Sequence, residues 1–170
     1  LPFELKSTDN KIISLDDIKG ENGTLIMFIC NHCPYVKAIT KEIVEDCNEL
    51  KKIGINSVAI CSNDFINYPE DSFDNMIKFS KDNQFSFPYL QDETQKIAKK
   101  YDAVCTPDFF GYDKDLGLQY RGRLRELKNF IPVKDGESDL LKAMKQIAET
   151  GKGPQDQIPS AGCGIKWKYN

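Results

Sequence analysis

The sequence is poor in several features that mark specialised classes of protein. It has one histidine, His32, and no stretch of the roughly 18 consecutive apolar residues that a membrane-spanning helix needs. It also has no cluster of Lys and Arg, and its net charge is −3 with a pI of about 5.3. These absences exclude a membrane span and argue against nucleic acid or an anionic membrane surface as a partner.

Cysteine is also scarce, at 6 residues in 170, which is too few for a fold held together by disulfide bonds. No internal repeat or low-complexity segment is visible, and hydrophobic residues make up 40% of the chain. We therefore expect a single domain over residues 1–170 with a buried core. We expect a cytoplasmic protein, with export as the open alternative, because the chain starts at Leu1 rather than Met and its native N-terminus is not identified.

Hydrophobic periodicity predicts alternating strands and helices along the first 150 residues. The run from Thr24 to Cys30 is continuously apolar, which is typical of a strand buried on both faces. After it, apolar residues recur every three or four positions, which predicts one helix from Pro34 to Lys52. The other expected strands are 3–5, 12–15, 56–62, 87–90, 108–112 and 118–124, and the other expected helices are 71–83, a short one containing 97–101, and 138–150.

This order predicts an α/β fold with a central mixed sheet flanked by helices. Strand–helix–strand units build a parallel centre, with one hairpin at the N-terminus and a second antiparallel hairpin over 108–124. Residues 151–170 are a Gly- and Pro-rich tail without helical periodicity. Because the carboxyl ends of parallel strands meet at one edge, we expect Cys30 and Cys61 to lie at that edge.

Cys30 and Cys33 form the only C-x-x-C motif of the chain, between a predicted strand and a predicted helix. Two cysteines at this spacing can close a small disulfide ring. The N–H groups at a helix N-terminus stabilise a thiolate, the form that attacks disulfides and peroxides. We expect Cys30 to be the more exposed nucleophile and Cys33 to resolve the mixed disulfide that Cys30 forms.

His32 lies between the two cysteines, so it can donate a hydrogen bond or a charge to the Cys30 thiolate and lower its pKa. The alternatives are a structural zinc site, two ordinary buried thiols, and an ordinary surface histidine. Neither a second C-x-x-C nor a pair of histidines accompanies the motif, which argues against zinc. We therefore expect a redox-active dithiol at Cys30 and Cys33, tuned by His32, and no metal.

The segment FICNHCPYVK at 28–37 follows a buried strand, and Thr106-Pro107 stands far downstream, before another strand. Together they resemble the thioredoxin superfamily, in its redoxin or peroxiredoxin-like branch (AhpC/TSA-related), in a subfamily that carries NHCPYV. The resemblance covers nearly the whole chain and implies a thioredoxin-like oxidoreductase. The further segments that carry it are 62–64, 68–72, 87–90, 105–109 and 159–163.

The resemblance also implies roles for single residues. Cys30 corresponds to the thioredoxin nucleophile. Cys33 corresponds both to the thioredoxin resolving cysteine and to the peroxidatic cysteine of peroxiredoxins. Pro107 corresponds to the cis-proline of thioredoxins, with Thr106 presenting its backbone to a bound substrate. The residues expected to support the site or bind substrate are therefore Asn31, Cys105, Thr106 and Pro107.

Departures from the peroxiredoxin pattern count against peroxide reduction. Cys30 stands where a Thr or Ser would precede the peroxidatic cysteine by three positions, and the arginine expected near Cys105 is missing. The strand 24–29 also lacks the buried carboxylate that accepts a proton in thioredoxins. Our leading prediction is a thiol–disulfide oxidoreductase. The alternatives are a thiol peroxidase and a cysteine-based metal-binding or redox-sensing module.

Two further cysteines are expected near the motif. Cys105 precedes Pro107 by two positions, and Cys163 lies in the tail, which we expect to pack on or near the active-site edge. Either one is a candidate for passing a disulfide to or from Cys30 and Cys33. Alternatively, all four thiolates bind zinc or an iron–sulfur centre.

Cys47 lies in the apolar stripe of a predicted helix, so we expect it in the core. Cys61 is either a buried strand residue or part of the functional edge. Arg121, Arg123 and Arg125 alternate along the chain and form either a solvated face or a surface for an anionic partner.

We expect no cofactor, because the cysteines themselves carry the electrons. The expected partners are a disulfide-containing protein or a small thiol or peroxide substrate, and a thiol reductant or oxidant that recycles the site. The sequence makes no prediction of the oligomeric state.

Overall fold

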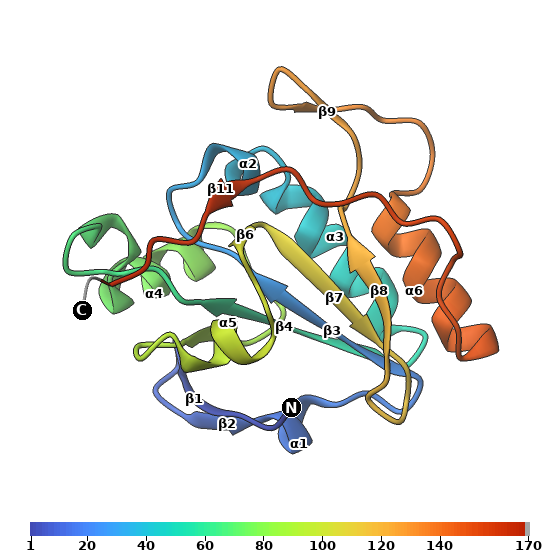
Figure 1. The fold of residues 1–170 in the computed structure, drawn as a ribbon, viewed down its shortest axis with the longest axis horizontal. Coiled ribbons are helices and arrows are strands. Elements are labelled where there is room, and N and C mark those ends of the chain that lie inside the picture. Colours follow the sequence, from blue (N-terminus) through green and yellow to red (C-terminus); the bar gives the residue numbers. More distant parts are fainter. Residues whose placement is uncertain (169–170) are drawn as a thin grey trace.

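The computed structural model describes residues 1–168. Its centre is a seven-stranded mixed sheet with helices on both faces (Figure 1). The strand order is β2-β1-β5-β4-β3-β7-β8, with parallel pairing between β3, β4 and β5 and antiparallel pairing elsewhere. This confirms the predicted α/β class, the central mixed sheet and both hairpins. The strands are β1 (Glu4–Ser7), β2 (Ile12–Ser14), β3 (Gly23–Phe28), β4 (Ile55–Cys61), β5 (Tyr89–Gln91), β7 (Asp108–Tyr112) and β8 (Leu118–Gly122).

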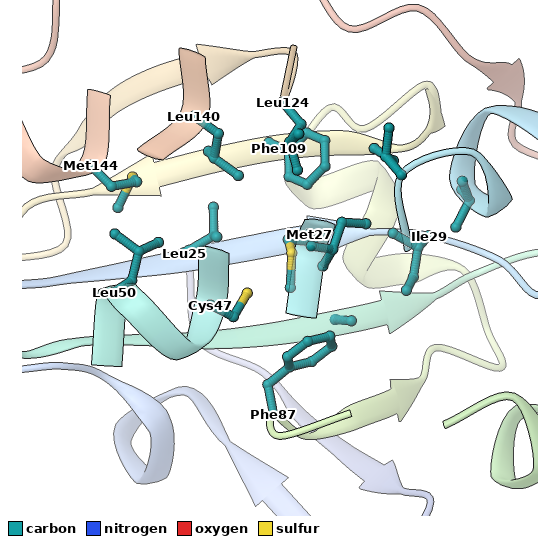
Figure 2. Close-up of a cluster of buried hydrophobic side chains, with 14 of the residues drawn as sticks. Leu25, Met27, Ile29, Cys47, Leu50, Phe87, Phe109, Leu124, Leu140 and Met144 are labelled. Atoms are coloured by element: carbon teal, nitrogen blue, oxygen red, sulfur yellow. The ribbon is translucent and has the colours of Figure 1, made fainter. Parts of the chain in front are cut away.

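Each face of the sheet is covered by its own set of helices, because successive side chains of β3 point to opposite faces. Leu25 and Met27 pack on one side (Figure 2), and Ile26 and Phe28 pack on the other. The first side is covered by α2 (Pro34–Lys37), α3 (Thr40–Lys51), α4 (Phe73–Asp82) and α6 (Asp139–Thr150), and the second by α1 (Leu15–Ile18) and α5 (Lys96–Lys100). Among the described residues, no helix has both the length and the apolarity to cross a bilayer.

The predicted helix from Pro34 to Lys52 is divided into α2 and α3. Ile39 departs from helical geometry, with φ −120° and ψ 5°, and the Thr40 hydroxyl donates to the Val36 carbonyl at 2.7 Å. The strand β3 also ends at Phe28, two residues before Cys30. The cysteine motif therefore lies on an irregular loop between β3 and α2.

The predicted helix 71–83 also starts later than expected. A turn of 3-10 helix, η1 (Pro69–Asp71), precedes α4, and the hydroxyl of Ser72 caps α4 by accepting the N–H of Asn75. The sequence did not predict this turn. The other elements missed were α1, the hairpin of β9 (Leu127–Lys128) with β10 (Ile131–Pro132), and the pair of β6 (Cys105–Thr106) with β11 (Cys163–Gly164).

The tail after α6 runs back across the molecule to β6 and continues towards α4 (Figure 1). There β11 pairs antiparallel with β6, with Cys163 opposite Thr106. Further on, the Lys166 carbonyl accepts the N–H of Asp64 at 2.8 Å, and the Lys166 N–H donates to the side-chain oxygen of Asn63 at 3.0 Å. The tail therefore lies against the loops that follow the carboxyl ends of β3 and β4.

Candidate functional site

The loop that carries Cys30 and Cys33 leaves the centre of the sheet and enters α2. The Ile29 N–H still donates to the Ile60 carbonyl of β4, so the chain keeps its sheet position up to Cys30. Cys33 is the N-cap residue of α2, and Pro34 occupies the first position of the helix, where proline needs no hydrogen bond. This places both thiols at the edge of the parallel strands.

Both cysteines are buried free thiols, and each is 1% exposed. The expectation that Cys30 is the more exposed of the two is therefore wrong. The reason is that Thr106 and the tail cover the loop. The Cys30 sulfur lies 3.5 Å from the Thr106 hydroxyl, and the Cys33 thiol donates to the Thr106 carbonyl at 3.3 Å. The peptide bond between Thr106 and Pro107 is cis.

The surroundings of the two thiols move their pKa values in opposite directions. A hydrogen bond from Cys30 lowers the pKa of Cys33 to about 4, and the Cys163 thiol and the Val36 N–H act in the same direction against burial. The same hydrogen bond raises the pKa of Cys30, and burial and the negative charge of Asp71 raise it further. The directions of these two pKa shifts favour the thiolate on Cys33, whereas the sequence predicted Cys30 as the nucleophile.

His32 lies against a buried carboxylate rather than on the open surface. Its Nδ1 is 2.7 Å from Oδ2 of Asp71, a side chain with no exposed area, and its ring is parallel to that of Tyr68 with centroids 6.1 Å apart. Asp71 also accepts the N–H of Asn31 and the side-chain N–H of Asn63, each at 2.8 Å. Three polar groups, from His32, Asn31 and Asn63, thus converge on one carboxylate beside the cysteine loop.

Asp71 is a site residue that sequence reasoning missed. We looked for a buried acid within the strand that precedes the motif, whereas this one comes from η1, 40 positions after Asn31 in the chain. No spacing in the sequence indicates this contact. The ligand-type atoms of Cys30, His32 and Asp71 all lie within 4.8 Å of one another, which makes them the one metal-compatible set in residues 1–168. The four-thiolate set proposed from the sequence is not gathered within that distance among these residues.

Asn31 holds the loop in place from inside the protein. Its side-chain N–H donates to the Glu70 carbonyl at 3.0 Å, and its side-chain oxygen accepts the Tyr89 hydroxyl at 2.8 Å. Asn31 is 7% exposed, so these contacts leave it little surface to present to a substrate. Its position fits a supporting role, because it ties the motif to η1 and to β5.

Of the remaining four cysteines, Cys47 and Cys61 are buried, whereas Cys105 and Cys163 are half-buried. Burial raises the pKa of Cys47 and of Cys61 to about 12 in each case. Cys105 is half-buried, and its thiol donates to the carbonyls of Pro107 at 3.6 Å and Ser160 at 3.9 Å. Burial and Asp108 raise its pKa to about 11. Cys163 is the thiol that reaches Cys33.

A cavity of about 410 Å³ opens beside Pro107, next to the cysteine loop. Tyr35 and Phe130 line it with their rings 4.9 Å apart, and Ile39 and the tail residue Ser160 also border it. Phe130 itself is 50% exposed. The cavity therefore offers a partly apolar surface next to the cis peptide.

Each of the three arginines of the chain forms an ion pair with an acidic side chain. Arg121 lies 3.2 Å from Asp108. Arg123 lies 2.7 Å from Asp139, and Arg125 lies 2.5 Å from Glu42. β8 ends at Gly122, so the predicted common strand face is interrupted, and each arginine is part of the structural framework.

Comparisons with known proteins place the chain among thioredoxin-fold proteins. The AhpC/TSA family matches residues 1–123. No curated protein matches the chain. An uncharacterized conserved protein from Geobacillus kaustophilus is 44% identical, with a TM-score of 0.94 over 100% of this chain and 90% of that one.

A hypothetical protein from Sinorhizobium meliloti is 32% identical, with a TM-score of 0.92 over 100% of this chain and 93% of that one. A more distant structure is a secreted disulfide oxidoreductase from Mycobacterium tuberculosis, at 15% identity. Its TM-score is 0.59 over 69% of this chain and 80% of that one. At this identity the likeness shows the fold alone, and that fold is thioredoxin-like, as the resemblance implied.

Proposed function

Because this chain belongs to the AhpC/TSA family and holds the buried thiols of Cys30 and Cys33 against the same residue, Thr106, we propose that it is a thiol–disulfide oxidoreductase. It cycles between a Cys30–Cys33 dithiol and the corresponding disulfide. The observation that carries the proposal is that both thiols of the C-x-x-C motif contact Thr106, directly before the cis peptide bond to Pro107. The lowered pKa of Cys33 supports it. A thiolate hydrogen-bonded to a thiol is the reactant state for disulfide exchange.

The reaction reduces a substrate disulfide in two exchanges. The Cys33 thiolate attacks one substrate sulfur, the substrate S–S bond breaks, and the departing thiolate takes up a proton. Cys30 then gives up its proton and attacks the Cys33 sulfur, which forms the Cys30–Cys33 bond and releases the second substrate thiol. One substrate disulfide is reduced to two thiols, one protein dithiol is oxidised, and a thiol reductant recycles the protein.

His32 and Asp71 are positioned to serve the proton that Cys30 gains and loses. Their ligand-type atoms lie within 4.8 Å of the Cys30 sulfur. The cis peptide at Pro107 and the adjoining cavity supply the surface against which a substrate chain lies. No cofactor enters this scheme.

The test is a count of thiols and a reductase assay on the whole chain. One equivalent of diamide should remove two thiols from the wild type and link Cys30 to Cys33. Reduction of insulin disulfides should fall about 100-fold or more in Cys30→Ser and in Cys33→Ser, because each loses one half of the couple. Cys47→Ala is the matched control and should stay within twofold. A wild type that keeps all its thiols after diamide would show the proposal to be wrong.

Peroxide reduction is the second candidate, favoured by the low pKa of Cys33 and by the family. The ion pairs of the three arginines argue against peroxide reduction. A peroxide bound at Cys33 would have no free guanidinium group to polarise its O–O bond. We expect hydrogen peroxide to be consumed no faster than by free cysteine. Rapid catalytic consumption that disappears only in Cys33→Ser would favour this candidate instead.

A further inference from the structure

The tail delivers a third thiol to the buried pair. Cys163 stands opposite Thr106 in the β11–β6 ladder, and Thr106 is the residue whose carbonyl accepts the Cys33 thiol. Cys163 packs against the core cluster that contains Cys30 and Cys33, and its thiol helps to lower the pKa of Cys33. The tail therefore brings a third sulfur next to the site of Cys33.

These three sulfurs differ in their access to solvent. Cys30 and Cys33 are each 1% exposed, whereas Cys163 is half-buried. A reductant molecule that approaches the closed protein therefore meets Cys163 before it meets Cys33. The proposed function requires the Cys30–Cys33 disulfide to be recycled by a thiol from outside, and Cys163 offers the more accessible sulfur for that step.

We propose, on the basis of the proposed function, that Cys163 is a third redox cysteine that carries the disulfide from Cys33 to the surface. In the oxidised protein Cys163 loses its proton and attacks the Cys33 sulfur. The Cys30–Cys33 bond breaks, a Cys33–Cys163 bond forms, and Cys30 takes up a proton. No electrons leave the protein in this step, which is an internal exchange.

An external thiol completes the cycle at the tail. It attacks the sulfur of Cys163, so that Cys33 departs as a thiolate and a mixed disulfide remains on Cys163. A second molecule of the same thiol releases Cys163, and the overall change is one protein disulfide reduced for two external thiols oxidised. The low pKa of Cys33 makes it a good leaving group in this second exchange.

A trapping experiment tests the proposed bond directly. The variant Cys30→Ser, treated with one equivalent of diamide, should lose two thiols, and peptide mapping should find Cys33 linked to Cys163. The double variant Cys30→Ser/Cys163→Ser should not form this cross-link. A single variant that keeps Cys33 and Cys163 as thiols, or that links Cys33 to Cys105 instead, would overturn the relay.

A kinetic experiment separates the relay from the underlying couple. Oxidised Cys163→Ser should still contain the Cys30–Cys33 disulfide, but glutathione should reduce it about tenfold or more slowly than it reduces the wild type. Equal rates would overturn the relay and leave the proposed function intact. A wild type that forms no Cys30–Cys33 disulfide would overturn the proposed function itself.

Two glycines next to Cys163 give a matched mechanical control. A Cβ added at Gly162 would lie 2.2 Å from the Thr106 carbonyl oxygen, so an alanine there must push the tail off β6. A Cβ at Gly164 meets no atom within 4 Å. In the Cys30→Ser background, Gly162→Ala should lower the yield of the Cys33–Cys163 cross-link several-fold, and Gly164→Ala should leave it unchanged. Equal yields in the two variants would count against the proposed placement of the relay.

Discussion

Cys33 and Cys47 are both buried thiols, 1% and 4% exposed, and both belong to the helical segment that follows β3. Burial raises the pKa of Cys47 to about 12, whereas the pKa of Cys33 falls to about 4. Cys47 points from the middle of α3 into the apolar cluster (Figure 2). Cys33 is the N-cap residue of a helix, and the neighbouring thiols of Cys30 and Cys163 lower its pKa. The difference teaches that donors around a sulfur decide its reactivity, and that burial alone makes it inert.

The strongest way to break this comparison is to remove the main donor to Cys33. In Cys30→Ala the midpoint of Cys33 ionisation should rise by about two pH units or more, because burial then acts with fewer compensating hydrogen bonds. The difference in absorbance at 240 nm between each protein and its Cys33→Ser counterpart reports the thiolate without requiring access to it. Cys47→Ala should leave the midpoint unchanged. The same midpoint in Cys30→Ala and wild type would show that Cys30 is not the donor.

The sign of the accompanying effect on stability follows from the direction of the pKa change. The folded value of Cys33 lies below the ordinary value of 9.0, so its ionisation stabilises the folded, reduced protein fully above pH 9. This contribution is lost as the pH falls from 9 through about 4. Cys30→Ala should raise the lower limit of this pH range, because it raises the folded pKa of Cys33. Urea unfolding at a series of pH values measures this change.

A second change alters the charge beside Cys30. Asp71→Asn removes the negative charge that opposes ionisation of Cys30, so the reduced dithiol becomes more favourable and the reduction potential rises by about 30 mV or more. The asparagine side chain also places its own N–H group opposite one of the groups that donate to the Asp71 carboxylate. This mismatch should lower the unfolding free energy by about 1–3 kcal/mol. The measurement is equilibration of the Cys30–Cys33 couple with a glutathione buffer. Asp74→Asn, exposed on α4, is the control. An unchanged potential in Asp71→Asn would remove Asp71 from the redox site.

The same contrast explains what the sequence could and could not predict. Apolar runs such as the one from Thr24 predicted the central strands, because a buried strand needs an unbroken apolar segment. The C-x-x-C spacing predicted that Cys30 and Cys33 lie together. The identity of the thiolate was not predictable, because it depends on donors from elsewhere in the chain. Asp71 reaches the loop from η1, and Cys163 reaches it through pairing of β11 with β6, and neither contact leaves a periodic trace.

Local breaks in the helices were hidden for a similar reason. The apolar periodicity continues without interruption across α2 and α3. The Thr40 hydroxyl nevertheless donates a hydrogen bond to the Val36 carbonyl, and the backbone leaves helical geometry at Ile39. Side-chain to backbone competition of this kind depends on a rotamer and not on periodicity.

The smallest expected effect concerns Asp46, the charged neighbour of Cys47 on α3. Asp46 is 6% exposed and accepts the Ser138 hydroxyl at 2.6 Å, and burial raises its pKa to about 6. Since the folded value exceeds the unfolded value of 3.8, the folded protein binds more protons between pH 4 and 6. The unfolding free energy therefore falls as the pH rises through this window, by up to about 3 kcal/mol.

Asp46→Asn keeps an acceptor for Ser138 and removes the charge, so it should flatten this pH dependence and add about 1–2 kcal/mol of unfolding free energy at pH 7. Urea unfolding at pH 4.5, 5.5 and 7 measures both effects, and Glu49→Gln, exposed on the same helix, should change neither. An unaltered slope in Asp46→Asn would mean that its carboxylate is already well compensated. In that case burial would not be the main cause of raised pKa values around Cys47, and the contrast between Cys47 and Cys33 could not be explained by burial.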